Sequence, residues 1–484
     1  MSPGFDGRCT LQPRIIVAWR RLLLSSALLF TCSSPGAAQS PPGAPVSASI
    51  TLSQAVEAAL SKYPGVSVFT EQVRYATAIL KQAQLAFLPR VDAVAQVNRA
   101  THNNVYGLLF PTGVLPSISG PAIQTNDPNS VWGSAIGVVV DWQPYDFGFR
   151  AAGVSAARAG ADRSEQSLAR TRLDVAASTA DAFLTVAAAD VIERVTTANV
   201  ERARTLLNVA KALADAGVRP RVEADRAQVE HALAEDALLT AHGAVQAARA
   251  LLASLVGRDT ADVTPVIDPL LEDRSLGLPP ASDASRATVP FIREQQAAIA
   301  EADAQLQRLE ASYKPRLDVE AVSYARGTGV APNALALTDA NGLAPDVRNW
   351  GVGFTATFPL MQIATRRAAR EAGAARVRGE QARLEQLSLD LKGRREAARA
   401  HLDAAIAVAR NTPNALNAAQ RAAREALVRY RTGLSTVVDV AEAQRLLAQT
   451  EAEHGRARLD VWRERLTLLA LEGSLDQLLR EISQ

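Results

Sequence analysis

The strongest constraint on the fold is that the sequence contains one pattern twice. Two corner segments carry it, 214–228 (A-D-A-G-V-R-P-R-V-E-A-D-R-A-Q) and 430–444 (Y-R-T-G-L-S-T-V-V-D-V-A-E-A-Q). Three pairs of positions keep the same or a similar residue at one constant offset: Gly217 and Gly433, Glu223 and Asp439, and Gln228 and Gln444. Each glycine follows a long Ala-rich helical pattern and can adopt positive φ at no steric cost. The repeat therefore predicts two similar helix–turn–helix corners.

Other matched pairs extend the repeat over most of the chain. Four of them recur at nearly the same offset: Pro64 with Pro290, Pro89 with Pro315, Pro144 with Pro359, and Gly257 with Gly473. The offset shrinks in one place only, between Pro89 and Pro144. A change of length at one place predicts a tolerant loop there and a fixed architecture elsewhere.

Residues 1–38 have the pattern of a secretory signal peptide. A basic segment precedes an apolar run at 22–30 that is too short to span a bilayer, and Ala38 ends a small-residue cleavage site. Cys32 allows lipidation as an alternative, which we do not expect because Thr31 precedes it. Cleavage after Ala38 removes both cysteines of the chain, so the mature protein is expected to have no disulfide.

The signal peptide at 1–38 is followed by two halves that show the same order of elements. The first repeat is predicted at 64–257, with a strand hairpin at 90–143, a long helix at 150–216, a tip at 217–221 and a return helix at 222–256. The second is predicted at 289–473, with a strand hairpin at 316–358, a long helix at 364–432, a tip at 433–436 and a return helix at 437–472. Three further segments, which we call equatorial, are 39–63, 258–288 and 474–484.

The predicted strands alternate polar and apolar residues and are about ten residues long, which is the length of a tilted membrane strand. The polar positions that we assign to a barrel lumen are Asp92, Gln96, Asp318 and Glu320. A half-buried sheet in a soluble protein has the same alternation, so that alternative stays open. Aromatic residues at or near the strand ends suit the girdle of a membrane barrel: Trp132, Trp142, Trp350 and Phe358.

Four strands cannot close a barrel, which takes about eight or more, and lipid does not tolerate open strand edges. If the strands enter a membrane, the chain must therefore share a barrel with copies of itself. The long helical patterns add a second constraint, because about sixty helical residues would extend on the order of 100 Å. The second long pattern is interrupted at Pro413, which predicts a kink. The expected fold class is mainly α with a transmembrane β part, built from four β-strands and long coiled-coil helices.

Composition and motifs argue against several classes of function. The chain has 52 Lys and Arg against 50 Asp and Glu, and a net charge of +2 does not favour nucleic acid as a partner. The 5 His are scattered, and the sequence contains no H-E-x-x-H, C-x-x-C or G-x-S-x-G motif. We therefore expect no enzyme, no cofactor and no metal site.

The sequence resembles the TolC-type outer membrane efflux proteins over about 50–480, nearly the whole mature chain. The motifs that carry the resemblance are the strand entries P-R-V-D and P-R-L-D, the segment Q-P-Y-D-F-G-F-R, and R-T-G-L-S-T-V-V-D-V-A-E-A-Q with its partner D-A-G-V-R-P-R-V-E. The resemblance implies a homotrimer with a twelve-stranded barrel in the bacterial outer membrane and an α-helical tunnel in the periplasm. The implied partners are a periplasmic adaptor, an inner-membrane pump driven by protons or ATP, and outer-membrane lipid.

Such a protein would conduct substrates passively to the exterior as part of a tripartite efflux or type I secretion system. The alternative from another class is a periplasmic coiled-coil adaptor or structural protein without a pore. Adaptors of that kind would have a single helical hairpin rather than a duplicated order of strands and rods, so the repeat favours the channel.

The resemblance also implies a periplasmic gate. Asp439 and Glu442 lie three residues apart on one helix face, and in the family these positions ring the closed entrance. A solvated helix start is the alternative. The resemblance implies that Tyr430 and Glu223 hold the tip closed by a hydrogen bond, for which ordinary coiled-coil packing of Tyr430 is the alternative. The family has a basic latch residue at the position of Ser435, which serine cannot replace.

Substitutes for the missing basic latch are Arg219, Arg221 or Arg431. The two tips are also expected to dock the adaptor, because they lie farthest from the strands; a plain helical corner is the alternative. The tip residues assigned to docking are Gly217, Val218, Arg219, Arg431, Gly433, Leu434 and Ser435.

Overall fold

Four strands form a single antiparallel sheet in the structure, a computed structural model of the chain. They are β2 (Arg90–Thr101), β3 (Ser130–Tyr145), β5 (Arg316–Thr328) and β6 (Val347–Thr357), and their order in the sheet is β2-β3-β5-β6. Pairing of β3 with β5 joins the two halves of the repeat, and β2 and β6 form the two edges. The structure describes residues 49–101, 130–260, 263–271, 289–329, 340–359, 363–476 and 479. The predicted signal peptide with Cys32 lies outside these residues.

The two faces of the sheet differ in polarity. Residue pairs across the sheet place Val91 beside Val140, Val140 beside Ala321, and Ala321 beside Val352, all on one apolar face. Phe354 and Trp350 of this face are 73% and 78% exposed. Apolar side chains so open to the surroundings indicate a face that another apolar phase or surface covers.

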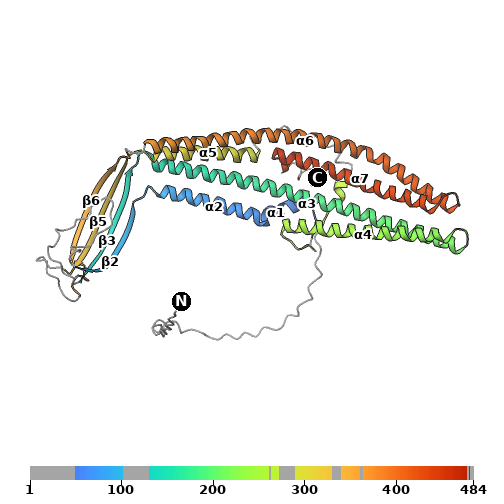
Figure 1. Ribbon diagram of the computed structural model, residues 1–484, viewed down its shortest axis with the longest axis horizontal. Coiled ribbons are helices and arrows are strands. Elements are labelled where there is room, and N and C mark those ends of the chain that lie inside the picture. Colours follow the sequence, from blue (N-terminus) through green and yellow to red (C-terminus); the bar gives the residue numbers. More distant parts are fainter. Residues whose placement is uncertain are drawn as a thin grey trace, which may run out of the picture. The chain divides into compact units, whose positions relative to one another are not determined.

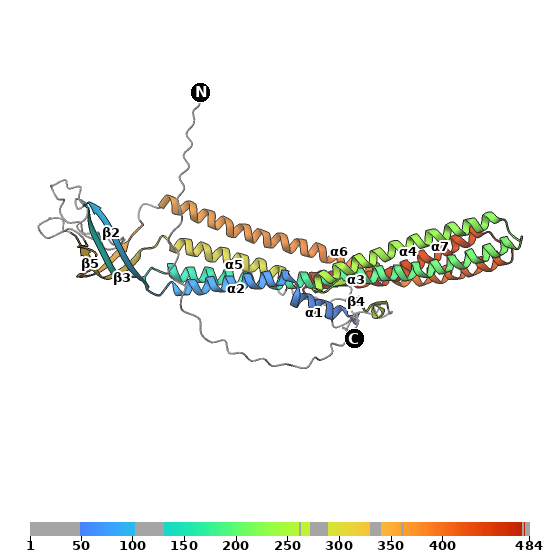
Figure 2. The same ribbon diagram turned by 90° about the horizontal axis from the view of Figure 1, so that it is seen from below.

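Six helices form a long bundle, and in Figures 1 and 2 the sheet lies at one end of it and the two helical turns at the other. The four long ones are α3 (Phe149–Asp215), α4 (Arg221–Val256), α6 (Ile363–Arg431) and α7 (Val437–Glu472). The two shorter ones are α2 (Pro64–Leu85) and α5 (Pro290–Ala311). Near the sheet α3 packs between α2 and α5, and towards the turns it packs against α4 and α7. This order makes α3 the central helix of the unit.

Small side chains explain how such long helices pack without a thick core. Alanine is the most frequent residue among the buried positions of α3, and examples are Ala180, Ala187 and Ala210. On α7, a Cβ added to Gly455 would collide with Cγ1 of Val191 on α3. Glycine is therefore needed at 455 for the close approach of these two helices.

Helix α6 continues through Pro413, the position at which the sequence predicts a kink. Proline removes the N–H that would bond the carbonyl oxygen of Ala409. The hydroxyl of Thr412 donates to that carbonyl at 3.1 Å, and Nδ1 of His454 on α7 lies 2.9 Å from the same hydroxyl. The side chain next to the proline thus satisfies the acceptor that the proline leaves open.

A small mixed region lies beside the middle of α3. It contains α1 (Leu52–Lys62) and a two-stranded parallel pair, β1 (Ser49–Ile50) with β4 (Thr264–Pro265), together with the short 3-10 helix η2 (Asp268–Leu271). Thr51 and Gln54 form the capping box of α1 that their spacing predicts. Phe183, Leu252 and Leu469 are fully buried in the largest apolar cluster here, and Nε1 of Trp462 donates to the carbonyl oxygen of Leu270 at 3.0 Å.

Among the residues that the structure describes, one helix passes a length-and-composition test for a membrane span. That helix is α3, in which the most apolar 18-residue window has a mean hydropathy of 1.5 and is 50% buried. Burial against α2, α4, α5 and α7 accounts for this apolar composition.

Candidate functional site

The two helical tips have the same backbone geometry. Gly217 and Gly433 have φ angles of +72° and +85°, in the left-handed region that glycine adopts freely. The amide of the next residue in each tip reaches back over the helix end: Val218 N donates to Leu213 O at 2.9 Å, and Leu434 N to Arg429 O at 2.8 Å. These are the bonds of a Schellman motif, so the predicted glycine turn forms in both repeats.

The return helices begin differently in the two tips. Thr436 caps α7, and the Asp439 carboxylate in turn accepts from the backbone N of Thr436 at 2.7 Å. Pro220 stands at the matching position before α4 and offers no side-chain cap. Glu223, which matches Asp439 in the repeat, is therefore not engaged in a capping box.

Glu223 instead accepts a hydrogen bond from Tyr430. The Tyr430 hydroxyl lies 3.1 Å from Oε2 of Glu223, and the tyrosine is 0% exposed. Its ring packs in an apolar cluster with residues of all four helices at the tips, among them Leu206, Ala227 and Val440. The bond therefore joins the end of α6 to the start of α4 in a buried setting, where it is shielded from water.

Arg219 completes this contact. Its Nη1 lies 3.6 Å from Oε1 of Glu223, and its guanidinium carbon lies 5.4 Å from the centroid of the Tyr430 ring. Its Nη2 donates to the carbonyl oxygen of Ser435 at 2.9 Å. Arg221 and Arg431, the other two basic residues considered as substitutes for the latch, are exposed.

The environment of Tyr430 keeps its hydroxyl protonated. Burial, together with the hydrogen bond and the negative charge of Glu223, raises the pKa of Tyr430 from 10.0 to about 12, and Arg219 partly opposes this rise. Tyr430 therefore remains a hydrogen-bond donor throughout the physiological pH range.

Asp439 and Glu442 are both exposed at the start of α7. Their spacing of three residues puts them on one side of the helix. Hydrogen bonds from the backbone and side chain of Thr436 lower the pKa of Asp439, so this carboxylate stays charged at neutral pH. Asp439 thus has a structural role as part of a capping box, in addition to any role of its charge.

Exposed apolar side chains occupy matching positions on the two tips. Leu434 is 71% exposed and Val218, its equivalent, 66%. One turn further on, Val438 and Val222 are also exposed and also match at the repeat offset. Val222 and Val438 were not selected from the sequence. They could have been found in the sequence, because they are apolar, match each other at the repeat offset and lie outside the apolar stripe by which each helix packs.

The four polar residues assigned to a lumen lie together on the face of the sheet opposite to the apolar one. Asp92 and Gln96 share this face in the alternation of β2, and Asp318 and Glu320 share it on β5. Nε2 of Gln143 donates to Asp318 at 2.6 Å, and Glu320 is buried. The aromatic residues Trp132, Trp142 and Trp350 belong to the apolar face, and Phe358 follows the end of β6.

The family of the chain follows from its sequence. Residues 55–258 and 282–474 match the outer membrane efflux protein family, and each match covers one copy of the repeat. The chain belongs to this family. No curated protein matches the sequence. The resemblance inferred from the motifs is confirmed, and with it the function in efflux and the location in the outer membrane.

Solved structures of outer membrane channels share the fold of this efflux protein. The outer-membrane channel OprN is 19% identical with a TM-score of 0.69, and the match covers 87% of this chain and 90% of that one. The CmeC outer membrane channel of Campylobacter jejuni is 13% identical with a TM-score of 0.70, and 89% of each chain is covered. The open state of the MtrE outer membrane channel of Neisseria gonorrhoeae is 18% identical with a TM-score of 0.63, covering 87% and 88%.

These similarities decide between the two classes considered from the sequence. The predicted fold class is confirmed, and the alternative of a periplasmic adaptor is not supported, because family and fold are those of channels. In the part of the chain that the structure describes, no group of three or more His, Cys, Asp or Glu is arranged to hold a metal ion.

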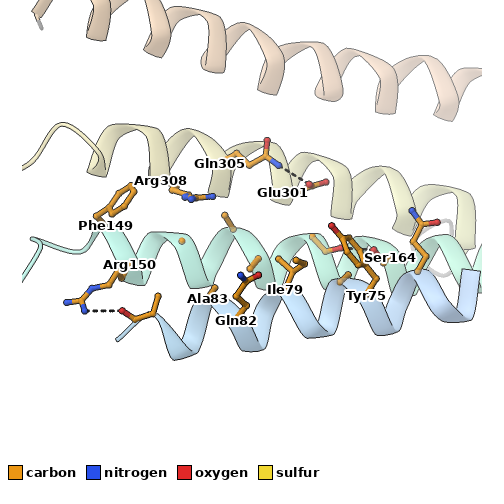
Figure 3. Close-up of a pocket in the computed structure, with 17 residues that line it drawn as sticks. Tyr75, Ile79, Gln82, Ala83, Phe149, Arg150, Ser164, Glu301, Gln305 and Arg308 are labelled. Carbon is orange, nitrogen blue, oxygen red and sulfur yellow. Dashed lines mark hydrogen bonds between the residues drawn. The ribbon is translucent and has the colours of Figure 1, made fainter. Parts of the chain in front are cut away.

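A groove of about 630 Å³ lies near the sheet end of the efflux protein, between α2, α3 and α5 (Figure 3). Tyr75 and Ile79 line it from α2, and Arg308 and Glu301 from α5. Among the described residues that line it, Glu301 is the one acidic side chain, and none is His or Cys.

The corner between β3 and α3 borders this groove and fixes how the helices leave the sheet. The carboxylate of Asp146 accepts from the amides of Gly148 and Arg150 at 3.1 and 2.9 Å. Arg150 bonds the same carboxylate at 2.7 Å and also donates to the carbonyl oxygen of Ala86 at 3.3 Å. These bonds lower the pKa of Asp146 despite its burial. The segment Q-P-Y-D-F-G-F-R is thus a structural corner.

Proposed function

We propose that three copies of this efflux protein form one channel, with a shared barrel of twelve strands in the outer membrane and a helical tunnel in the periplasm. The observation that carries the proposal is the single four-stranded sheet, which has one apolar face and two edge strands, β2 and β6. Lipid does not tolerate unpaired strand edges. Pairing of β2 with β6 of the next copy removes both edges and leaves the apolar face outward.

In this assembly the polar face of the sheet lines the lumen. Asp92, Gln96, Asp318 and Glu320 then face the pore, and the exposed Phe354 and its neighbours face lipid. Trp132 and Trp350 lie towards the loop end of the strands, and Trp142 and Phe358 towards the helix end. Two aromatic levels on the lipid side are the arrangement of a membrane girdle.

The helical tips form the periplasmic entrance. In the closed state, Tyr430 and Glu223 hold the start of α4 against the end of α6 within each subunit. A hydrogen bond to a charged group contributes about 1.5–3 kcal/mol, an amount that a docking partner can offset. Asp439 and Glu442 of three subunits supply six carboxylates around the entrance, which attract cations and repel one another.

The partners that complete the pathway are a periplasmic adaptor and an inner-membrane pump driven by protons or ATP. The adaptor docks on the tips, where both repeats offer turn backbone (Gly217 and Gly433) and exposed apolar side chains (Val218 and Leu434), beside the exposed Arg431. The channel itself conducts passively and supplies no chemistry, in line with a family and fold of channels.

Cysteine pairs across the proposed subunit boundary test the assembly. One cysteine replaces an outward residue of β2, such as Ala95, and the other a series of outward residues of β6, from Val352 to Ala356. We expect one combination to give disulfide-linked trimers in the membrane. A matched control pairs the Ala95 position with Gly353, which lies on the other face of the sheet. Monomers from every combination, in a protein that is inserted in the membrane, would overturn the trimer.

A further inference from the structure

We propose that Arg219 is the latch that ties the two tips of one subunit together. The inference rests on the proposed function of the tips as a gate. It assigns a positioning role to a residue whose three contacts reach the start of α4, the end of α6 and the turn before α7.

The geometry distinguishes Arg219 from the neighbouring arginines. Its side chain is 17% exposed, and the side chain of its partner Glu223 is 12% exposed. The bond of Nη2 to the Ser435 carbonyl crosses from the first tip to the second. Arg221 and Arg431 lie on the exposed side of the tips. Of these three arginines, Arg219 alone therefore combines low exposure with contacts to both tips.

The repeat explains where this residue comes from. Arg219 and Ser435 are separated by 216 residues, the offset of the two tips, so they occupy the same position in the two copies. The guanidinium of Arg219 in the first copy bonds the backbone carbonyl of Ser435, which is the equivalent position in the second copy. A basic group can thus stand between the two tips whichever copy supplies it.

The chemistry of arginine suits all three contacts at once. The planar guanidinium has several N–H donors in a fixed fork and stacks on aromatic rings, so it can form an ion pair with a carboxylate and donate to a carbonyl while it covers Tyr430. A buried carboxylate that loses its cation is strongly unfavourable. Removal of Arg219 is therefore expected to weaken the Tyr430–Glu223 bond as well as its own contacts.

Single-channel conductance of the full-length protein in planar bilayers tests the latch. We expect Arg219→Gln to raise the ratio of open to closed states about tenfold or more, the equivalent of one lost charge-assisted hydrogen bond. Arg219→Lys keeps the charge without the fork and should give an intermediate value. Arg221→Gln is the matched control and should conduct as the wild type does. A wild-type ratio for Arg219→Gln, in trimers of normal stability, would overturn the inference.

Two further variants show whether Arg219 acts through the proposed contacts. The double variant Arg219→Gln with Tyr430→Phe should have a ratio of open to closed states only slightly above that of the more open single variant, because both changes break one network. Fully additive effects on this ratio would contradict a shared latch.

Arg219→Ser combined with Ser435→Arg should restore most of the closed state, since the basic group then comes from the other copy, and no recovery would count against the bridge. If Tyr430→Phe opens the channel but Arg219→Gln does not, the gate stands and the latch fails; if neither does, the proposed gate fails too.

Discussion

Glu223 and Asp439 occupy the same position in the two repeats, yet their carboxylates have opposite environments. Glu223 is 9% exposed and accepts from Tyr430, whereas Asp439 is exposed and bonds Thr436 at the start of its own helix. The difference follows from the residue three positions before each acid, which is Pro220 in one copy and Thr436 in the other. One repeated pattern thus gives a contact between helices in the first tip and a helix cap in the second.

Tyr430→Phe should open the tip without disturbing the fold. The ring stays in its apolar cluster, and only the bond to Glu223 is lost. A hydrogen bond of this kind to a charged group contributes about 1.5–3 kcal/mol, so the ratio of open to closed states should rise by about tenfold or more. Single-channel recording measures that ratio. Tyr75→Phe is the control, because Tyr75 is exposed on α2, and an unchanged ratio in Tyr430→Phe would place the closing contact elsewhere.

Alkaline pH should open the wild-type tip through Tyr430. The folded protein holds the hydroxyl proton to a pKa of about 12, compared with 10.0 for an exposed tyrosine. The stabilisation by this group is therefore complete below pH 10 and is lost as the pH rises towards 12. We expect conductance to stay level from neutral pH to about pH 10 and to increase above it. The increase should be absent in Tyr430→Phe, and an equal increase in that variant would assign the effect to another group.

The sequence predicted the parts of the tips that depend on local geometry. A turn between two helices needs a residue at positive φ, and glycine at 217 and 433 meets that need in any context. A helix cap is local in the same way: Thr436 and Asp439, which are three residues apart, form a capping box. Both features depend on a few neighbouring residues, so a pattern in the sequence is sufficient to find them.

Contacts between the helices could not be predicted in the same way. Three arginines near the tips had equal standing in the sequence, and only the packing of Tyr430 selects Arg219. Helix α6 likewise continues through Pro413 because the hydroxyl of Thr412, held near His454 of α7, bonds the carbonyl that proline leaves open. In both cases a deciding partner belongs to another helix or to the other copy of the repeat, far away in the chain.

Charge at the entrance can be separated from helix capping by two substitutions. Asp439→Asn and Glu442→Gln each remove one carboxylate per subunit, so both should lower the preference of the channel for cations. Asp439→Asn should also lower the thermal stability of the tip, because its carboxylate bonds Thr436. Glu442→Gln should leave that stability unchanged. Reversal potentials in a salt gradient measure the preference, and equal selectivity of both variants and wild type would leave capping as the role of Asp439.

A side chain at a turn glycine should destabilise the tip, in contrast to a side chain at a glycine inside a helix. Gly433→Ala places a Cβ at a φ of +85° and should destabilise the tip by about 1 kcal/mol, although nothing but the end of Arg219 lies near the new atom. Gly243→Ala is the matched control: Gly243 lies within α4, and its Cβ would meet no atom within 4 Å. That change should stabilise the protein by about 0.5–1 kcal/mol, because alanine favours the helix. Amide hydrogen exchange measures the first effect over the tip at 433–436 and the second along α4. Equal protection of the tip in Gly433→Ala and wild type would show that the turn accepts another conformation.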